Sequence, residues 1–367
     1  MTIACARARG VNLAQGVCDT PVPEVVRRAA QAAIEAGANT YTRSDGAPEL
    51  RAALAAKMRR DGGLDYSPDG EIVVTSGATG AFYVAAQGLL EPGDEVILFE
   101  PYYGYHRNTL ESLGVRPVYV PLHAPEFALS LAELERAVTP RTRALIVNTP
   151  GNPSGKVWTR AELEAVGELA RARDLWIFTD EVYEHFVFDG AKHVSPASLP
   201  GLRDRTITMN ALSKTFAITG WRIGWLAAPR ALAEPFAHLH DLVYVCAPAP
   251  LQHACAAGLE KLDPEYYAAI GAEYRRKRDE LCEALDDAGL TPIRPRGSYF
   301  ALADISKLPG ASGDERAMAL LERARVACVP GTAFWEGDEA HRWGRFCFGK
   351  TDEDLAEACR RLRNMQV

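Results

Sequence analysis

A lysine and a carboxylate each stand just behind a short apolar segment of this chain. Asp180 follows residues 175–179, and Lys214 follows the segment 206–210 closely. A lysine in an apolar setting has a depressed pKa and can act as an amine nucleophile, whereas a lysine on an exposed loop has no such property. A carboxylate behind a buried strand is costly unless a cation pairs with it. That cation could belong to the protein or to a ligand.

Two further segments carry groups that suit a flat, phosphorylated ligand. Ser76-Gly-Ala-Thr-Gly80 opens a predicted helix, where exposed N–H groups and the helix dipole favour an anion. Glu100-Pro-Tyr-Tyr-Gly-Tyr105 places three tyrosines behind another apolar segment, where they could stack on a ring. Taken singly, these segments are equally compatible with a tight turn and with core packing.

The segment Thr149-Pro-Gly-Asn-Pro-Ser-Gly-Lys156 superficially resembles a phosphate-binding loop for nucleoside triphosphates. The spacing from Gly151 to Gly155 is one residue too short, and Val157 stands where a hydroxyl should bind magnesium. We therefore reject nucleotide binding at this segment.

The combination indicates one cofactor more strongly than any single segment does. A lysine nucleophile, a buried acid, a phosphate cradle and an aromatic plate are together what pyridoxal phosphate requires. The lysine forms the Schiff base, and the acid keeps the pyridine nitrogen protonated so that the ring can accept electrons.

The elements that must position these residues alternate between strands and helices. Strands are predicted at residues 71–75, 95–99, 144–148, 175–179 and 206–210, with helices at 80–90 and near 160–173. The strand segments are rich in Val, Ile and Leu without alternation, which is typical of parallel strands buried on both faces. The pattern predicts an α/β fold with a mainly parallel sheet between helices, whose strand ends bind the ligand.

A second, smaller α+β domain is predicted after about residue 250. It begins with a long charged helix that includes residues 273–280, and residues 294–300 and 326–329 are its predicted strands. A helix near 352–363 closes the chain. The first 30 or so residues are expected to be short and extended and to pack on this domain. We therefore predict a large domain at residues 30–250 and a small domain made of residues 1–29 and 251–367.

Composition excludes several classes of protein. A net charge of −7 over 367 residues argues against a nucleic-acid binder. No apolar run approaches the roughly 18–20 residues that span a bilayer, so no membrane segment is predicted. The start of the chain also lacks the apolar core of a signal peptide.

Cysteine and histidine usage predicts neither disulfides nor a metal site. The eight cysteines are scattered without a C-x-x-C pair, which favours free thiols in a reducing compartment, and we expect a cytoplasmic protein. The segment Asp180-Glu-Val-Tyr-Glu-His185 mixes acids with a histidine, but it lacks the ligand spacing of a zinc site.

From Asn12-Leu-Ala-Gln-Gly16 to Arg345-Phe-Cys-Phe348, the chain resembles the class I/II aminotransferases of the fold-type I pyridoxal-phosphate enzymes. The most specific motifs are Asn152-Pro-Ser-Gly155, Asp180-Glu-Val-Tyr183 and Ser213-Lys-Thr-Phe-Ala-Ile-Thr-Gly-Trp-Arg222, in the order of the family. Tyr41 and the segment Gly46-Ala-Pro-Glu-Leu-Arg51 are similar to its early motif.

The resemblance implies a role for each matching residue. Lys214 would hold the cofactor and move the proton, and Asp180 would pair with the pyridinium nitrogen. Asn152 and Tyr183 would bind the ring oxygen of the cofactor, and Tyr103 would stack on its ring face. The phosphate would be bound by Ala78, Thr79 and Arg222, and Tyr41 would reach the phosphate in the partner subunit. Arg345 would clamp the substrate carboxylate beside Gly16.

Three positions depart from the family pattern and leave the substrate open. Ala211 replaces a frequent phosphate-binding hydroxyl, Arg43 replaces a frequent proline, and Thr79 stands where one aspartate-preferring subgroup has lysine. The resemblance implies a homodimer with shared active sites that moves an amino group from an L-amino acid to a 2-oxo acid.

Two other functions are weighed against transamination. A pyridoxal-phosphate enzyme of the same fold could instead eliminate or replace a β or γ group. A regulator built on this fold would carry a DNA-binding segment before it, and Gly16 is expected to lie too near the start to leave room.

Overall fold

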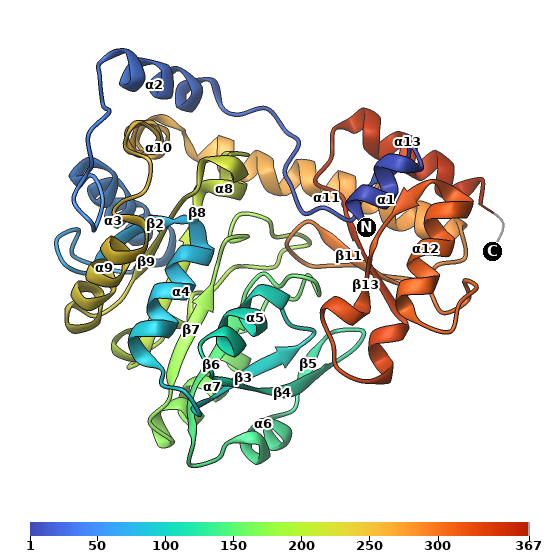
Figure 1. The fold of residues 1–367 in the computed structure, drawn as a ribbon, viewed down its shortest axis with the longest axis horizontal. Coiled ribbons are helices and arrows are strands. Elements are labelled where there is room, and N and C mark those ends of the chain that lie inside the picture. Colours follow the sequence, from blue (N-terminus) through green and yellow to red (C-terminus); the bar gives the residue numbers. More distant parts are fainter. Residues whose placement is uncertain (366–367) are drawn as a thin grey trace.

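The computed structural model describes residues 1–365, which form a larger and a smaller body around separate sheets (Figure 1). The larger body contains an eight-stranded sheet in the order β2-β9-β8-β7-β6-β3-β4-β5. β9 and β5 run antiparallel to their neighbours, and all other neighbouring pairs are parallel. The strands are β2 (Ile72–Ser76), β3 (Glu95–Glu100), β4 (Arg116–His123), β5 (Ala128–Leu129), β6 (Thr142–Asn148), β7 (Trp176–Asp180), β8 (Thr206–Ala211) and β9 (Ile223–Ala227).

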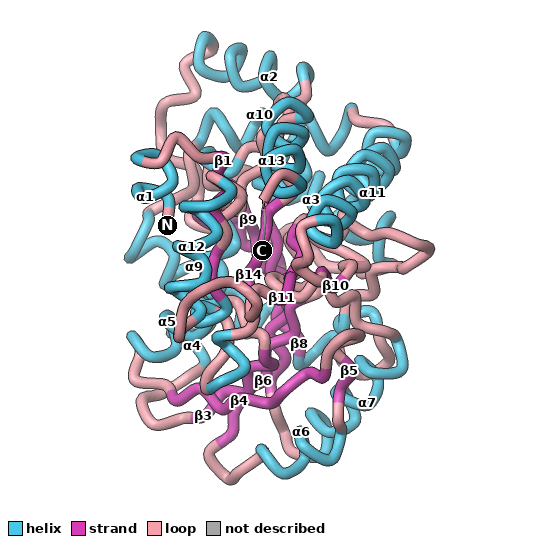
Figure 2. The backbone as a smooth tube through the Cα atoms, turned by 90° about the vertical axis from the view of Figure 1, so that its right-hand side faces the viewer, coloured by secondary structure: helices cyan, strands magenta, loops and turns pink. Residues whose placement is uncertain are grey.

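Helices bury both faces of this sheet, as the unbroken apolar runs predict. Along β6, Ala144 and Ile146 pack with one group of helices, whereas Leu145 and Val147 pack with the other. Figure 2 shows the strands running between these two layers. The first layer contains α4 (Gly77–Leu89), α5 (Gly104–Ser112) and α9 (Arg230–Tyr244); the second contains α2 (Glu24–Glu35), α3 (Pro48–Gly62), α6 (Leu131–Ala137), α7 (Arg160–Ala172) and α10 (Ala249–Lys261).

The smaller body is built on a four-stranded antiparallel sheet in the order β10-β11-β14-β13. A separate parallel pair joins β1 (Val11–Asn12) to β12 (Val326–Ala327). The other elements are β10 (Pro292–Ile293), β11 (Phe300–Asp304), β13 (Val329–Pro330), β14 (Trp343–Cys347), α1 (Thr2–Arg7), α11 (Pro264–Asp287), α12 (Gly313–Ala324) and α13 (Asp352–Arg363). Short 3₁₀ helices lie at Pro196–Ser198, Arg203–Arg205, Thr219–Trp221, Gly331–Ala333 and Asp338–His341.

The structure confirms the mainly parallel, helix-covered sheet and places every predicted strand of it within two residues. It also adds β4, β5 and β9. β4 contains Pro117 and Pro121, which removes two N–H donors from the run, and β5 has only two residues. None of the helices in residues 1–365 is long and apolar enough to cross a bilayer, and all eight cysteines are free.

Two local predictions were wrong. Residues 294–300 are not a strand: only Phe300 belongs to β11, because Ser298 has a left-handed φ of +61° that interrupts an extended run. The first 30 residues are not simply extended, since they form α1 and begin α2. In α2, Val26 and Ala30 are buried on one face, which packs against α10. The domain limits at residues 30 and 250 stay a prediction.

Candidate active site

A cavity of about 690 Å³ lies where the two bodies meet. Asn148, Asp180 and Ala211 enter it from the carboxyl ends of β6, β7 and β8. The parallel arrangement brings these ends to one edge of the sheet, as in other open α/β folds. The smaller body closes the cavity with Phe300 and Arg345.

Lys214 lies on α8 (Leu212–Thr215), the short helix that follows β8. Its Nζ donates to the Gly16 carbonyl at 3.3 Å and lies 5.9 Å and 5.4 Å from the ring centroids of Tyr183 and Tyr299. Burial lowers the pKa of the Lys214 amine. The neutral amine is the nucleophilic form, so the structure supplies the setting that the sequence argument requires.

Asp180 ends β7 and is 6% exposed. Its Oδ2 atom lies 3.2 Å from Nε2 of His106, and this is its one ion-pair contact within residues 1–365. His106 lies on α5, three residues after Tyr103, and packs edge-on against the Tyr103 ring. Residues three apart in a helix lie on the same face, so a histidine three residues after Tyr103 could have been predicted to lie in the same site. His106 was not among the site residues predicted from the sequence.

Ala78 and Thr79 lie in the first turn of α4 and line the cavity beside Arg222. Arg222 has φ +58° and donates to the Thr219 carbonyl at 2.9 Å. A Cβ atom on Gly77 would collide with this guanidinium, so only glycine lets the arginine approach the helix start. The helix start and the guanidinium together form a concave donor site suited to a phosphate.

Arg345 lies on β14 and is buried, with its guanidinium 4.2 Å from the ring centroid of Phe300. It donates from Nη1 to Oδ1 of Asn152 and from Nη2 to the Ala14 carbonyl, both at 2.8 Å. Burial lowers the pKa of this guanidinium, and its Nε has no hydrogen-bond partner. A cation held this way has donor capacity left for a carboxylate in the cavity.

The other predicted residues divide into two groups. Tyr103, Tyr183 and Gly16 line the cavity, and burial raises the pKa of both tyrosines. Tyr41 is 80% exposed and is not among the residues that line it. Arg43 is exposed, does not line the cavity either, and forms a bidentate pair with Asp45 at 3.0 and 2.8 Å.

The segment that resembles a nucleotide loop has a structural explanation. Lys156 Nζ lies 2.6 Å from Glu162, and burial lowers the pKa of this amine. The lysine is therefore committed to an ion pair with α7.

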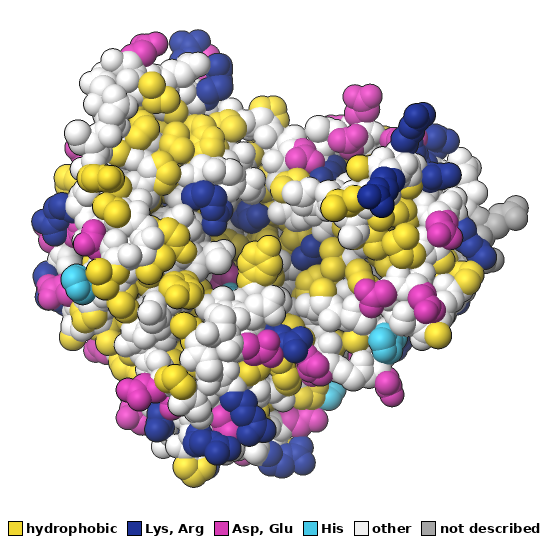
Figure 3. Space-filling model, viewed as in Figure 1, with side chains coloured by type: hydrophobic (Ala, Val, Ile, Leu, Met, Phe, Trp, Pro, Cys, Tyr) yellow, Lys and Arg dark blue, Asp and Glu magenta, His cyan; other side chains and the backbone are white. Residues whose placement is uncertain are grey.

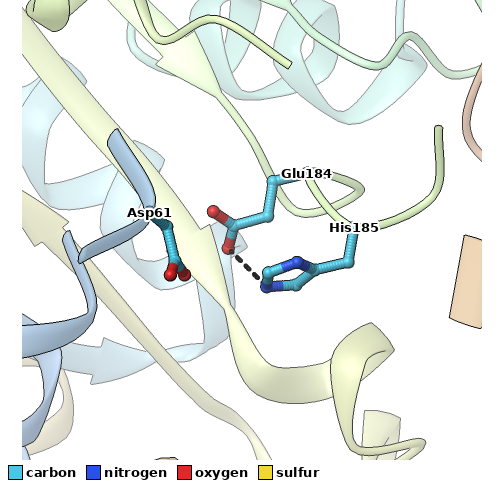
Figure 4. A group of neighbouring side chains, drawn as sticks. All are labelled: Asp61, Glu184 and His185. Carbon is cyan, nitrogen blue, oxygen red and sulfur yellow. Dashed lines mark ion pairs between the residues drawn. The ribbon is translucent and has the colours of Figure 1, made fainter. Parts of the chain in front are cut away.

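One group of metal-ligand side chains, Asp61, Glu184 and His185, converges outside the cavity (Figure 4). A protein cation already contacts both carboxylates, because Lys57 Nζ lies 2.7 Å from Glu184 and 3.1 Å from Asp61. We assign no metal to this group.

Comparison with known proteins identifies the family. The family model described as "Aminotransferase class I and II" matches residues 8–362. The chain is 41% identical to the probable N-succinyldiaminopimelate aminotransferase DapC of Mycobacterium tuberculosis, over 99% of this chain and 94% of the relative. It is 42% identical to the arginine–pyruvate transaminase AruH of Pseudomonas aeruginosa, over 94% and 86%.

The solved structures agree with the sequence comparison. The N-succinyldiaminopimelate aminotransferase of M. tuberculosis superposes with a TM-score of 0.95 at 41% identity, covering 99% of this chain and 95% of that chain. A methionine aminotransferase of Escherichia coli gives a TM-score of 0.94 at 32% identity, covering 99% and 95%. The chain therefore belongs to the class I and II aminotransferase family.

Proposed function

We propose that the protein is a pyridoxal-phosphate-dependent aminotransferase that moves the amino group of an L-amino acid to a 2-oxo acid. The observation that carries the proposal is the placement of Lys214, a buried amine with a lowered pKa, in one cavity with Asp180 and Arg345. Enzymes of this family use pyridoxal phosphate, and the residues lining the cavity fit that group.

The fit rests on polar atoms that have no partner within the protein. Ser213 lines the cavity, and its buried hydroxyl makes no hydrogen bond. It lies beside the phosphate cradle of Ala78, Thr79 and Arg222, and it can supply the hydroxyl that Ala211 lacks. Asp180 with His106 would face the pyridine nitrogen.

The other walls suit the ring of the cofactor. Tyr103 would cover one face of the ring. Tyr183 and the amide nitrogen of Asn152 would serve the ring oxygen, since Oδ1 of Asn152 already accepts from Arg345.

The bound cofactor supplies an electron sink for the charge left when the substrate loses its α-proton. The neutral Nζ of Lys214 takes that proton from the substrate Cα and acts as the general base. Arg345 fixes the α-carboxylate and so orients the Cα–H bond toward Lys214. Asp180, as a buried carboxylate, favours the protonated ring nitrogen.

Elimination or replacement at the β or γ carbon would begin from the same residues. The relatives of this chain carry names for amino-group transfer, which gives no support to that alternative.

We also propose a cytoplasmic homodimer in which Tyr41 reaches the partner's cofactor phosphate. Tyr41 is an exposed aromatic, and the end of α9 exposes Leu242, Val243, Tyr244 and Val245. Figure 3 shows hydrophobic side chains gathered over α9, α4 and α10. Apolar surface of this kind is typical of a subunit interface.

Borohydride reduction of the purified holoenzyme tests the proposal. The expected result is a pyridoxal adduct on Lys214, found by peptide mass spectrometry, together with 2-oxo acid formed from an amino-acid panel. An adduct on Lys156 or Lys192 would contradict it. Release of ammonia or sulfide would also contradict it, because elimination yields a 2-oxo acid too but frees the nitrogen as ammonia.

A further inference from the structure

A second cavity of about 290 Å³ lies on the other side of β8 from Lys214. Thr208 and Asn210 line this second cavity, whereas Ala211 lines the first. Successive residues of a strand point to opposite faces, so β8 separates the two cavities. Its last two residues face different cavities: Asn210 faces the second and Ala211 the first.

A buried ion pair borders the second cavity. Lys57, on α3, is 2% exposed, and its Nζ lies 2.7 Å from Oε1 of Glu184. Figure 4 shows the Glu184 carboxylate pointing toward Asp61 and His185. Burial alone would raise the pKa of Glu184, but Lys57 and two neighbouring histidines hold it below its usual range. Glu184 is therefore a charged acceptor at neutral pH.

The same carboxylate oxygen holds Asn210. Oε1 of Glu184 accepts from Nδ2 of Asn210 at 2.7 Å, and Oδ1 of Asn210 accepts from the backbone N–H of Ala211 at 2.7 Å. Both ends of the Asn210 amide are thus engaged. A continuous series of short contacts therefore runs from Lys57 through Glu184 and Asn210 to Ala211, the residue directly before α8.

α8 needs such support because it is too short to hold itself. It has four residues, and its N-cap, Ala211, has no side chain that can cap it. At its other end, the Tyr266 hydroxyl donates to the Thr215 carbonyl at 2.5 Å. Lys214 lies between these two anchors.

Packing does not confine Glu184 on the side of the second cavity, where space is open. The ion pair with Lys57 must therefore set the position of its carboxylate. If the charge of Lys57 is removed, Glu184 can turn into this space and release the Asn210 amide.

We propose that Lys57 and Glu184, acting through Asn210, are positioning residues that fix the main chain at Lys214. The inference rests on the proposed function, in which Lys214 holds the cofactor and moves the proton. A displacement of Lys214 alters the proton transfer more than the binding of substrate, because substrate affinity depends on Arg345 across the cavity.

The test compares Lys57→Met with Lys277→Met in the holoenzyme. Lys277 is also 2% exposed, and it pairs with Glu273 at 2.9 Å and donates to the Lys350 carbonyl at 2.7 Å. Each variant removes a buried cation. Lys57→Met unpairs the largely buried Glu184, whereas Lys277→Met unpairs the exposed Glu273, and only Lys57 connects to α8. Lys57→Arg keeps a cation beside Glu184 and serves as the rescue.

We expect Lys57→Met to lower kcat by about ten- to hundred-fold, the scale of a small misplacement of a catalytic group. KM should stay within about two-fold, and the pH midpoint of the cofactor absorbance should move. Lys277→Met should keep kcat and the midpoint, and Lys57→Arg should restore most of kcat. Asn210→Ala breaks the link without unpairing a charge and should reproduce the loss of kcat if Lys57→Met does not fold.

The inference would be overturned if Lys57→Met or Asn210→Ala kept the wild-type kcat and the wild-type pH midpoint of the cofactor absorbance. The ion pair would then have a purely structural role. Borohydride separates this failure from a failure of the proposed function. An adduct on Lys214 combined with unchanged kcat overturns the positioning role alone, whereas an adduct on another lysine overturns both.

Discussion

Replacing Arg345 with lysine separates a substrate clamp from a structural cation. The guanidinium uses Nη1 and Nη2 for Asn152 and the Ala14 carbonyl, each at 2.8 Å, and retains further N–H groups for a carboxylate. An ammonium keeps the charge, but it cannot serve both partners and grip a carboxylate with two parallel bonds.

The magnitude follows from the bond that is lost. A hydrogen bond to a charged group contributes about 1.5–3 kcal/mol, so binding of both substrates should weaken about ten- to hundred-fold. Steady-state kinetics should show this as a higher KM for both the amino acid and the 2-oxo acid. The absorbance of the bound cofactor should not change, because Lys214 and the phosphate cradle are untouched.

Arg43→Lys is the matched control. Its guanidinium is exposed and paired with Asp45, so this variant should keep the wild-type KM. If Arg345→Lys is less stable or loses cofactor more readily, while the KM of its folded, cofactor-loaded fraction stays at the wild-type value, Arg345 is a structural cation. A raised KM in Arg43→Lys would place the carboxylate site there instead.

Three further outcomes are expected. Asp180→Asn should retain cofactor, but its turnover should fall by roughly 10³, equivalent to about 4 kcal/mol of barrier; turnover near that of the wild type would exclude the assigned role. Because burial lowers the pKa of Lys214 in the folded chain, the unfolded chain binds more protons between the lowered pKa and the ordinary value near 10.5. Stability of the cofactor-free protein should therefore rise with pH through that window, and Lys214→Met should be more stable than the wild type at pH 7 and lose this advantage as pH approaches 10.5. Thermal unfolding across pH measures this, and an equal pH dependence in both proteins would contradict it. Sedimentation should give a dimer, and a fully active monomer would disprove the shared site at Tyr41.

Much of the fold could be predicted because the strands of the larger sheet are buried on both faces and carry a continuous apolar signal. Residues 144–148 and 206–210 show this signal and became β6 and β8. β4, next to the edge strand β5, could not be predicted in this way because Pro117 and Pro121 interrupt its apolar run. The helix α2 near the start of the chain was not predicted for a different reason. Its small apolar residues are buried only by packing against α10, which is distant in the sequence.

The candidate site could be predicted where chemistry follows a strand, as at Asp180 and Lys214. The contact of His106 with Asp180 could not, because α5 and β7 meet only in the folded sheet. Arg345 approaches Asn152 from 193 residues away in the chain. Local patterns contain no information on such pairs. The role of Tyr41 stays a prediction, since it concerns a second copy of the chain.

The loop of residues 13–16, which follows β1, affects how the contributions of single residues to this enzyme can be measured. The two cations of the cavity are held by main-chain oxygens of this segment, Lys214 by Gly16 and Arg345 by Ala14. Exchanging side chains there leaves those oxygens in place, so a systematic alanine scan would score Gln15 as dispensable and could not test Ala14, which is already alanine. Gly16 would stand out only for its size, because a Cβ atom there would lie 2.7 Å from the Phe300 ring. Backbone chemistry, such as an ester in place of an amide, is the perturbation that would expose what this segment contributes.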